Sequence, residues 1–96
     1  MDVLELTKKL ISTPTVSKDS NDPVNSYLEQ MLAEGGFEIE RKTYEDENGV
    51  LKANFVAKLG PGSGGLAFCS HSDTVPGQED QWPAFDPEEK GELLYG

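Results

Sequence analysis

Apolar residues recur at helical spacing in the first third of the chain. Four of them predict an amphipathic helix over residues 2–12, which Asp2 would cap: Val3, Leu6, Leu10 and Ile11. A second helix is predicted to run to about Glu34, with Asp22 as its cap residue and Pro23 in its first turn. Gly35-Gly36 would end it in a left-handed conformation.

The pattern then changes to that of strands. In residues 37–44 the odd positions Phe37, Ile39, Arg41 and Thr43 alternate with the charged Glu38, Glu40 and Lys42, which predicts a strand with one wetter face. Asn48-Gly49 is a strong hairpin signal. The return strand is expected over residues 50–59. A continuous apolar run, Leu66-Ala67-Phe68-Cys69, is typical of a strand buried on both faces. The order helix, helix, hairpin, strand predicts an α/β fold in which this last strand is central.

The only histidine, His71, falls where that strand would end. Ligands of open α/β sheets sit outside the carboxyl ends of strands, so the position suits chemistry. Asp73 lies two residues on, and side chains two apart on an extended backbone share a side. A metal-bound histidine usually donates its other ring N–H to a carboxylate or carbonyl. His71 is therefore a candidate metal ligand, with Asp73 as its orienting partner or a further ligand. The alternative is a histidine held by a carboxylate for structure alone.

Other reactive side chains have simpler interpretations. Cys69 is interpreted as a buried, unreactive thiol, because zinc sites need three or four converging ligands. A serine nucleophile in the loop 13–17 is not expected, since no second histidine could activate it. Trp82 and Phe85 would be a lid over a substrate or, as we favour, apolar anchors of a long loop. Glu88-Glu89, in the predicted turn region 87–91, is interpreted as a solvated charge cluster.

Composition narrows the function classes. The 96 residues allow one small domain, and 18 acidic against 8 basic residues give a net charge of -10. Such a charge repels phosphate backbones and anionic membranes, so neither nucleic acid nor membrane is an expected partner. One cysteine excludes an internal disulfide framework and favours the cytoplasm. The N-terminal segment MDVLELTKKL lacks the basic region and apolar core of a signal peptide.

An ordered series of motifs closely resembles the first metal-binding segment of the M20 metallopeptidase family. These motifs are Ser70-His71-Ser72-Asp73-Thr74-Val75-Pro76, then Trp82-Pro83 and Phe85, then Lys90-Gly91-Glu92-Leu93-Leu94-Tyr95-Gly96. The family pattern is Gly-His-x-Asp-x-Val-Pro, a Trp and a Pro-Phe, then Gly-x-Leu-Tyr-Gly. Ser70 replaces the usual glycine, and the Trp and Pro-Phe spacing is rearranged, but neither departure touches the ligand.

The resemblance implies a two-zinc amidohydrolase in which Co²⁺ can substitute, with His71 as a metal ligand and Asp73 as a catalytic residue. Its substrate would be a small N-acyl amino acid, as in acetylornithine deacetylases and succinyl-diaminopimelate desuccinylases. The full-length protein would be a homodimer. The remaining ligands and the dimerisation domain lie downstream in the family, so residues 1–96 are expected to be the N-terminal part of a catalytic domain and inactive alone. The alternatives are an M20 dipeptidase or carboxypeptidase, and a binding module that keeps the fold without catalysis.

Overall fold

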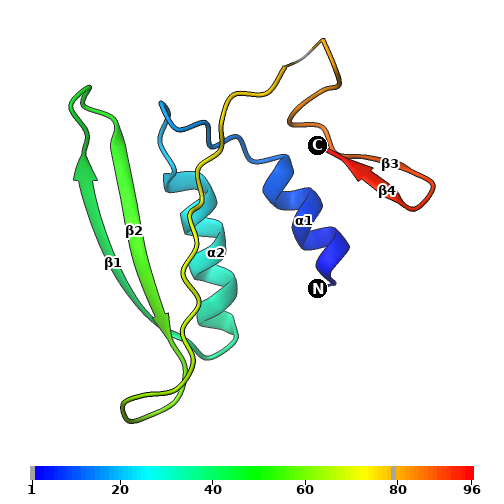
Figure 1. Cartoon of the computed structure of the whole chain (residues 1–96). Helices are drawn as coiled ribbons and strands as arrows, with labels where there is room; N and C mark the ends of the chain where they lie inside the picture. The colour runs from blue at the N-terminus through cyan, green and yellow to red at the C-terminus, as the bar shows by residue number, and fades with distance from the viewer. Residues whose placement is uncertain (1, 79) are drawn as a thin grey trace.

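The computed structural model describes residues 2–78 and 80–96, which form two helices and two antiparallel hairpins (Figure 1). The predicted mixed α/β class is therefore confirmed. In chain order the elements are α1 (Val3–Ile11), α2 (Asp22–Glu34), β1 (Glu38–Glu45), β2 (Leu51–Lys58), β3 (Glu88–Lys90) and β4 (Leu93–Tyr95).

Both helices form within a residue of their predicted bounds, because their end signals are local. The carboxylate of Asp2 accepts the backbone N–H of Glu5 at 2.8 Å and caps α1. Helix α2 begins at Asp22, so Asn21 and not the predicted Asp22 is at the cap position. The chain leaves the helix through Gly36, whose φ of 91° suits glycine. Among the described residues, no helix is long and apolar enough to cross a bilayer.

The hairpin of β1 and β2 is also confirmed, with register running from Glu38 opposite Lys58 to Glu45 opposite Leu51. Its turn is held by the Asp46 carboxylate, which accepts the N–H groups of Asn48 and Val50 at 2.8 and 2.9 Å. These two bonds lower the pKa of Asp46, the bond from Val50 having the larger effect. The turn therefore prefers the ionised carboxylate.

Helix α2 packs on this hairpin, alongside β2 in Figure 1. Among the described residues the buried apolar side chains are Val24 on α2 and Ala53 on β2, which are 4% and 1% exposed. The side-chain amide of Asn21 spans the backbone of Ala53, donating to its C=O at 2.9 Å and accepting its N–H at 2.8 Å. The amide of buried Asn25 donates to the same carbonyl at 2.8 Å. Polar contacts therefore hold the helix against the strand, together with the apolar contacts.

A second fastening joins the other strand to the same helix. The guanidinium of Arg41 on β1 forms ion pairs with Asp22 and Glu29 of α2, and lies 3.3 Å from the hydroxyl of Ser26. A planar guanidinium can serve several acceptors at once, which suits it to this position between strand and helix. Glu38 and Glu40 are exposed while Ile39 and Arg41 between and after them are half-buried, so the predicted wetter face is confirmed over residues 38–41. Residues 42–45 are all exposed, so the prediction does not hold there.

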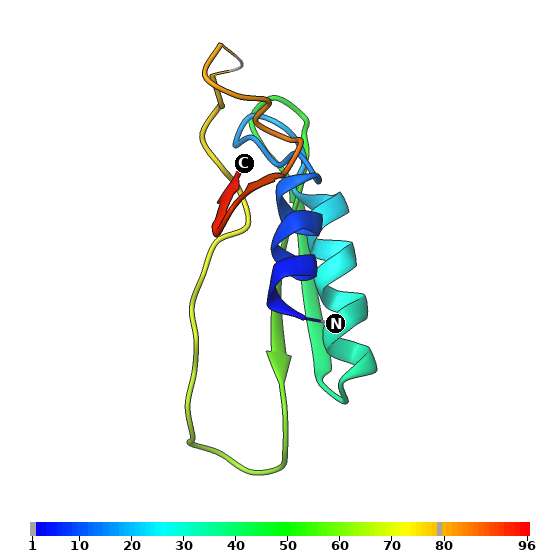
Figure 2. The same cartoon turned by 90° about the vertical axis from the view of Figure 1, so that its right-hand side faces the viewer.

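The prediction of a central buried strand at residues 66–69 is wrong. These residues are exposed and form no strand, with Leu66 at 82% and Phe68 at 89% exposure. Cys69 is exposed as well, which corrects its interpretation as a buried thiol. In Figure 2 the segment after β2 runs apart from the helices and the hairpin. An apolar run becomes a strand only when neighbouring backbone supplies hydrogen-bond partners, and no described strand pairs with it.

The small hairpin of β3 and β4 was not predicted. Gly91, with φ of 62°, is the first of two residues that join its strands, the place where a tight hairpin favours glycine. Glu88 and Glu89 therefore lie on a strand rather than in a turn. Both remain exposed, but Glu89 forms an ion pair with Lys8 of α1, so the pair is not simply a solvated cluster. The contact brings the two ends of the described chain together.

Candidate functional site

His71 and Asp73 meet as their spacing predicts. The Nδ1 atom of His71 lies 2.9 Å from the backbone oxygen of Asp73 and 3.0 Å from its Oδ1. A carbonyl oxygen can only accept, so Nδ1 must carry the ring proton. In the neutral ring the other nitrogen, Nε2, then holds a lone pair, on a side chain that is 83% exposed. This arrangement leaves Nε2 able to bind a cation or accept a proton.

The second oxygen of the Asp73 carboxylate is also engaged. The hydroxyl of Ser17 donates to Oδ2 at 2.6 Å, the length of a charge-assisted bond. This hydrogen bond, followed by the contact with His71, lowers the pKa of Asp73 below its ordinary value. Asp73 is therefore an ionised acceptor that faces a serine on one side and the imidazole on the other.

The loop before α2 holds the site in place. The backbone of residues 15–17 pairs with Thr74 in an isolated parallel bridge: Thr74 N–H donates to Thr15 at 2.9 Å, and Ser17 N–H donates to Thr74 at 3.0 Å. The buried hydroxyl of Thr15 donates to the backbone oxygen of Ser72 at 2.7 Å. The sequence placed His71 at the end of a central strand. In the structure this loop-to-loop pairing, and not a strand, positions it.

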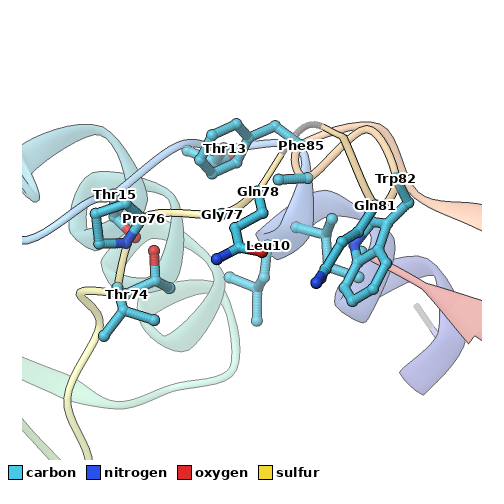
Figure 3. Close-up of a pocket in the computed structure, with 14 residues that line it drawn as sticks. Leu10, Thr13, Thr15, Thr74, Pro76, Gly77, Gln78, Gln81, Trp82 and Phe85 are labelled. Atoms are coloured by element: carbon cyan, nitrogen blue, oxygen red, sulfur yellow. The ribbon is translucent and has the colours of Figure 1, made fainter.

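A cavity of about 520 Å³ lies next to this pairing (Figure 3). It shares Thr15 and Thr74 with the site and is bounded by the end of α1, the loop after Thr74 and the last residue. Trp82 lines it and packs edge-on against Tyr95 of β4, with ring centroids 6.4 Å apart. Phe85 lines the same cavity. These contacts favour the interpretation of Trp82 and Phe85 as anchors of the loop.

Comparison with curated proteins identifies close relatives over nearly the whole chain. The acetylornithine deacetylase of Photorhabdus laumondii is 40% identical over 101 residues, which cover 97% of this chain. The succinyl-diaminopimelate desuccinylase of Ehrlichia canis is 34% identical over 100 residues, covering 100% of it, and that of Nitrobacter hamburgensis is 33% identical over 98 residues, covering 99%. The chain is a homologue of these M20 enzymes.

The family resemblance inferred from the motifs is thus confirmed. The chain spans about a quarter of the length of these relatives: 26% of the deacetylase, and 26% and 25% of the two desuccinylases. No family model matches the sequence. No solved structure matches it either.

By themselves, the described residues of this M20 homologue do not make a complete metal centre. They contain no group of three or more His, Cys, Asp and Glu side chains able to hold one ion. Protein zinc sites use three or four protein ligands, so His71 Nε2 supplies one ligand at most of such a set. The donor fits zinc in kind, since imidazole is one of its usual ligands, but a zinc site needs more ligands than His71 supplies.

Two members of the site were not found from the sequence. Thr15 and Ser17 were assigned to a loop, and their contacts lie 57 and 56 residues away along the chain. Neither residue carries a local pattern that points to Asp73. The exclusion of a serine nucleophile still stands as an expectation, because the Ser17 hydroxyl donates to a carboxylate rather than to a histidine.

Proposed function

We propose that this chain is a segment of a zinc-dependent hydrolase that removes the acyl group from an N-acyl amino acid. Support comes from one observation above all, a histidine whose Nδ1–H is held by Asp73 and whose Nε2 faces solvent. This arrangement lies in a chain 33–40% identical to deacetylases and desuccinylases. The hydrolysed bond would be the amide between acyl group and amino acid.

In this proposal His71 is one ligand of the metal site, and Asp73 is the carboxylate that fixes its ring. A bound zinc would polarise the scissile carbonyl and acidify a water molecule. The Asp73 carboxylate would hold the ring in the tautomer whose lone pair is on Nε2. The other ligands and the general base belong to chain beyond these residues. We also propose a cytoplasmic location, which suits a chain with one free, exposed cysteine.

The test begins with the intact mass of the native product, compared with 10.5 kDa for these 96 residues. The native protein is then assayed for release of acetate from acetylornithine and of succinate from succinyl-diaminopimelate, with and without a chelator. We expect hydrolysis of one of them, abolished by chelation and restored by Zn²⁺ or Co²⁺.

His71→Ala should reduce hydrolysis to the level of the chelated protein, because the metal loses a ligand. Ser63→Ala is the matched control, since Ser63 is exposed in the glycine-rich turn away from the site. Full activity in the His71 variant would contradict the proposal. Release of amino acids from dipeptides, without deacylation, would favour a dipeptidase.

A binding module without catalysis is the second candidate, favoured by the missing group of three ligands among the described residues. It requires a native product with the mass of this chain and no metal-dependent hydrolysis. The mass measurement therefore separates the two candidates before any assay is run.

A further inference from the structure

The hydrogen bond between Ser17 and Asp73 joins two loops that are 56 residues apart. We infer that Ser17 is a positioning residue, whose hydroxyl fixes the Asp73 carboxylate so that His71 keeps its ring proton on Nδ1. The role in catalysis rests on the proposed function, whereas the effect on the imidazole does not.

The hydroxyl of Ser17 has one proton and two acceptors within reach. Oδ2 of Asp73 lies at 2.6 Å and the backbone oxygen of Thr74 at 3.1 Å. The shorter contact, to a charged oxygen, is the stronger one. Oδ2 is then occupied, and Oδ1 is turned toward His71 Nδ1 at 3.0 Å. The terminal torsion of aspartate has a broad energy profile, so a carboxylate without this bond would turn more freely.

Ser17 is itself held by its backbone. Its N–H donates to Thr74 at 3.0 Å, and its carbonyl accepts from the ammonium of Lys52 on β2 at 2.6 Å. The backbone of Ser17 is thus held between Thr74 and the main hairpin, which fixes the position of its hydroxyl. A serine with a fixed backbone can orient a carboxylate, whereas a serine with a free backbone would move together with the carboxylate.

A simpler role for Ser17 would be to tie the two loops together. Thr15 already does so, because its hydroxyl donates to the backbone oxygen of Ser72 at 2.7 Å without touching Asp73. Thr15→Val keeps the shape of that side chain and removes its hydrogen bond. It is therefore a matched control that weakens the loop contact but leaves the carboxylate engaged.

The experiment measures the tautomer of the ring by ¹⁵N NMR, at a pH where the imidazole is neutral. These 96 residues contain a single histidine, and in a longer native product the ring signals of His71 are identified by their loss in His71→Ala. We expect the Nδ1–H form to be the major tautomer in the wild type and in Thr15→Val. In Ser17→Ala we expect it to be the minor tautomer. Ser17→Thr should restore it, since threonine keeps the hydroxyl.

The inference is overturned if Ser17→Ala retains Nδ1–H as the major tautomer, if Thr15→Val loses it to the same degree, or if the wild type shows Nε2–H. Amide shifts of the main hairpin report folding in each variant. Should Ser17→Ala not fold, Ser17→Cys carries the test, because a thiol of similar size is only a weak donor. A smaller loss of Nδ1–H is then expected, and an unchanged ring refutes the inference.

Failure here and failure of the proposed function are distinguishable. The tautomer is measured without metal or substrate, so a serine effect can be present in a protein that hydrolyses nothing. If the native protein is an active metalloenzyme, Ser17→Ala should also weaken its Zn²⁺ affinity by about 10-fold, measured by competition with a chelating dye. Unchanged affinity would contradict the positioning role in that enzyme.

Discussion

At the scale of single residues, local spacing predicts contacts and distant pairing does not. His71 and Asp73 are two residues apart, and their contact in the structure follows from an extended backbone. Ser17 completes the same site from 56 residues away, and only the folded chain brings it there. The sequence could therefore predict the contact of His71 with Asp73 but not the hydrogen bond of Ser17 to Asp73. The assignment of metal ligand and catalytic roles stays a prediction.

Asp46 gives a residue-scale prediction about pH. Its pKa lies below the ordinary value of 3.8, mainly because the ionised carboxylate accepts the N–H of Val50. The carboxylate therefore stabilises the turn above the ordinary pKa, and this contribution is lost as pH falls through the lower, folded-state pKa.

The amide shifts of Val50 and Asn48 should consequently move toward unfolded values as pH is lowered from about 6 to about 2. Asp46→Asn keeps an acceptor oxygen but cannot titrate, so its turn should be less sensitive over the same range. Equal acid sensitivity in the two proteins would mean that these bonds do not hold the turn.

At the scale of elements, those with local end signals were predicted correctly. The caps of the helices and the Asn48-Gly49 turn act over a few residues, and α1, α2 and the main hairpin all formed as expected. The strand at residues 66–69 failed because its apolar run carries no information about a partner. The small hairpin of β3 and β4 was missed, although Gly91 between two short strands was a usable signal.

The attachment of α2 to β2 supports a prediction about stability. Asn21→Ala removes two hydrogen bonds from Ala53 and leaves its buried N–H without a partner, while Asn25 still serves the carbonyl. An orphaned buried donor costs about 1–3 kcal/mol, so urea unfolding should show a loss of that order.

The control is Asn54→Ala, because Asn54 lies on the same strand but is exposed. It should change the unfolding free energy by less than about 0.5 kcal/mol. A similar loss of unfolding free energy in both variants would show that the hydrogen bonds of Asn21 to Ala53 do not specifically stabilise the fold.

At the scale of the whole molecule, the described chain is more open than a compact domain. Its Cα radius of gyration is 15.4 Å, against about 12.5 Å for a globular domain of this length. The two buried apolar side chains contrast with exposed Leu66 and Phe68 on the segment after β2. An apolar surface of this kind favours contact with further protein.

We therefore expect the 96-residue chain to self-associate, and sedimentation velocity at several concentrations measures this directly. The double variant with Leu66→Ser and Phe68→Ser should shift the protein toward monomer without loss of stability, since neither side chain is buried. Val3→Ser is the control, because Val3 is also exposed but lies on α1. Association unchanged in the double variant would assign it to another surface.

The pairing of Thr74 with Thr15 and Ser17 also has a kinetic consequence. It closes a loop that contains α2 and the whole main hairpin, because the bonded positions Ser17 and Thr74 are 57 positions apart along the chain. Closing so long a loop is entropically costly, whereas the hairpin turn needs only neighbours in sequence. The contacts around His71 should accordingly form last during folding and break first in denaturant. The arrangement of His71 and Asp73 would then be lost at denaturant concentrations where the helices and the main hairpin are still folded.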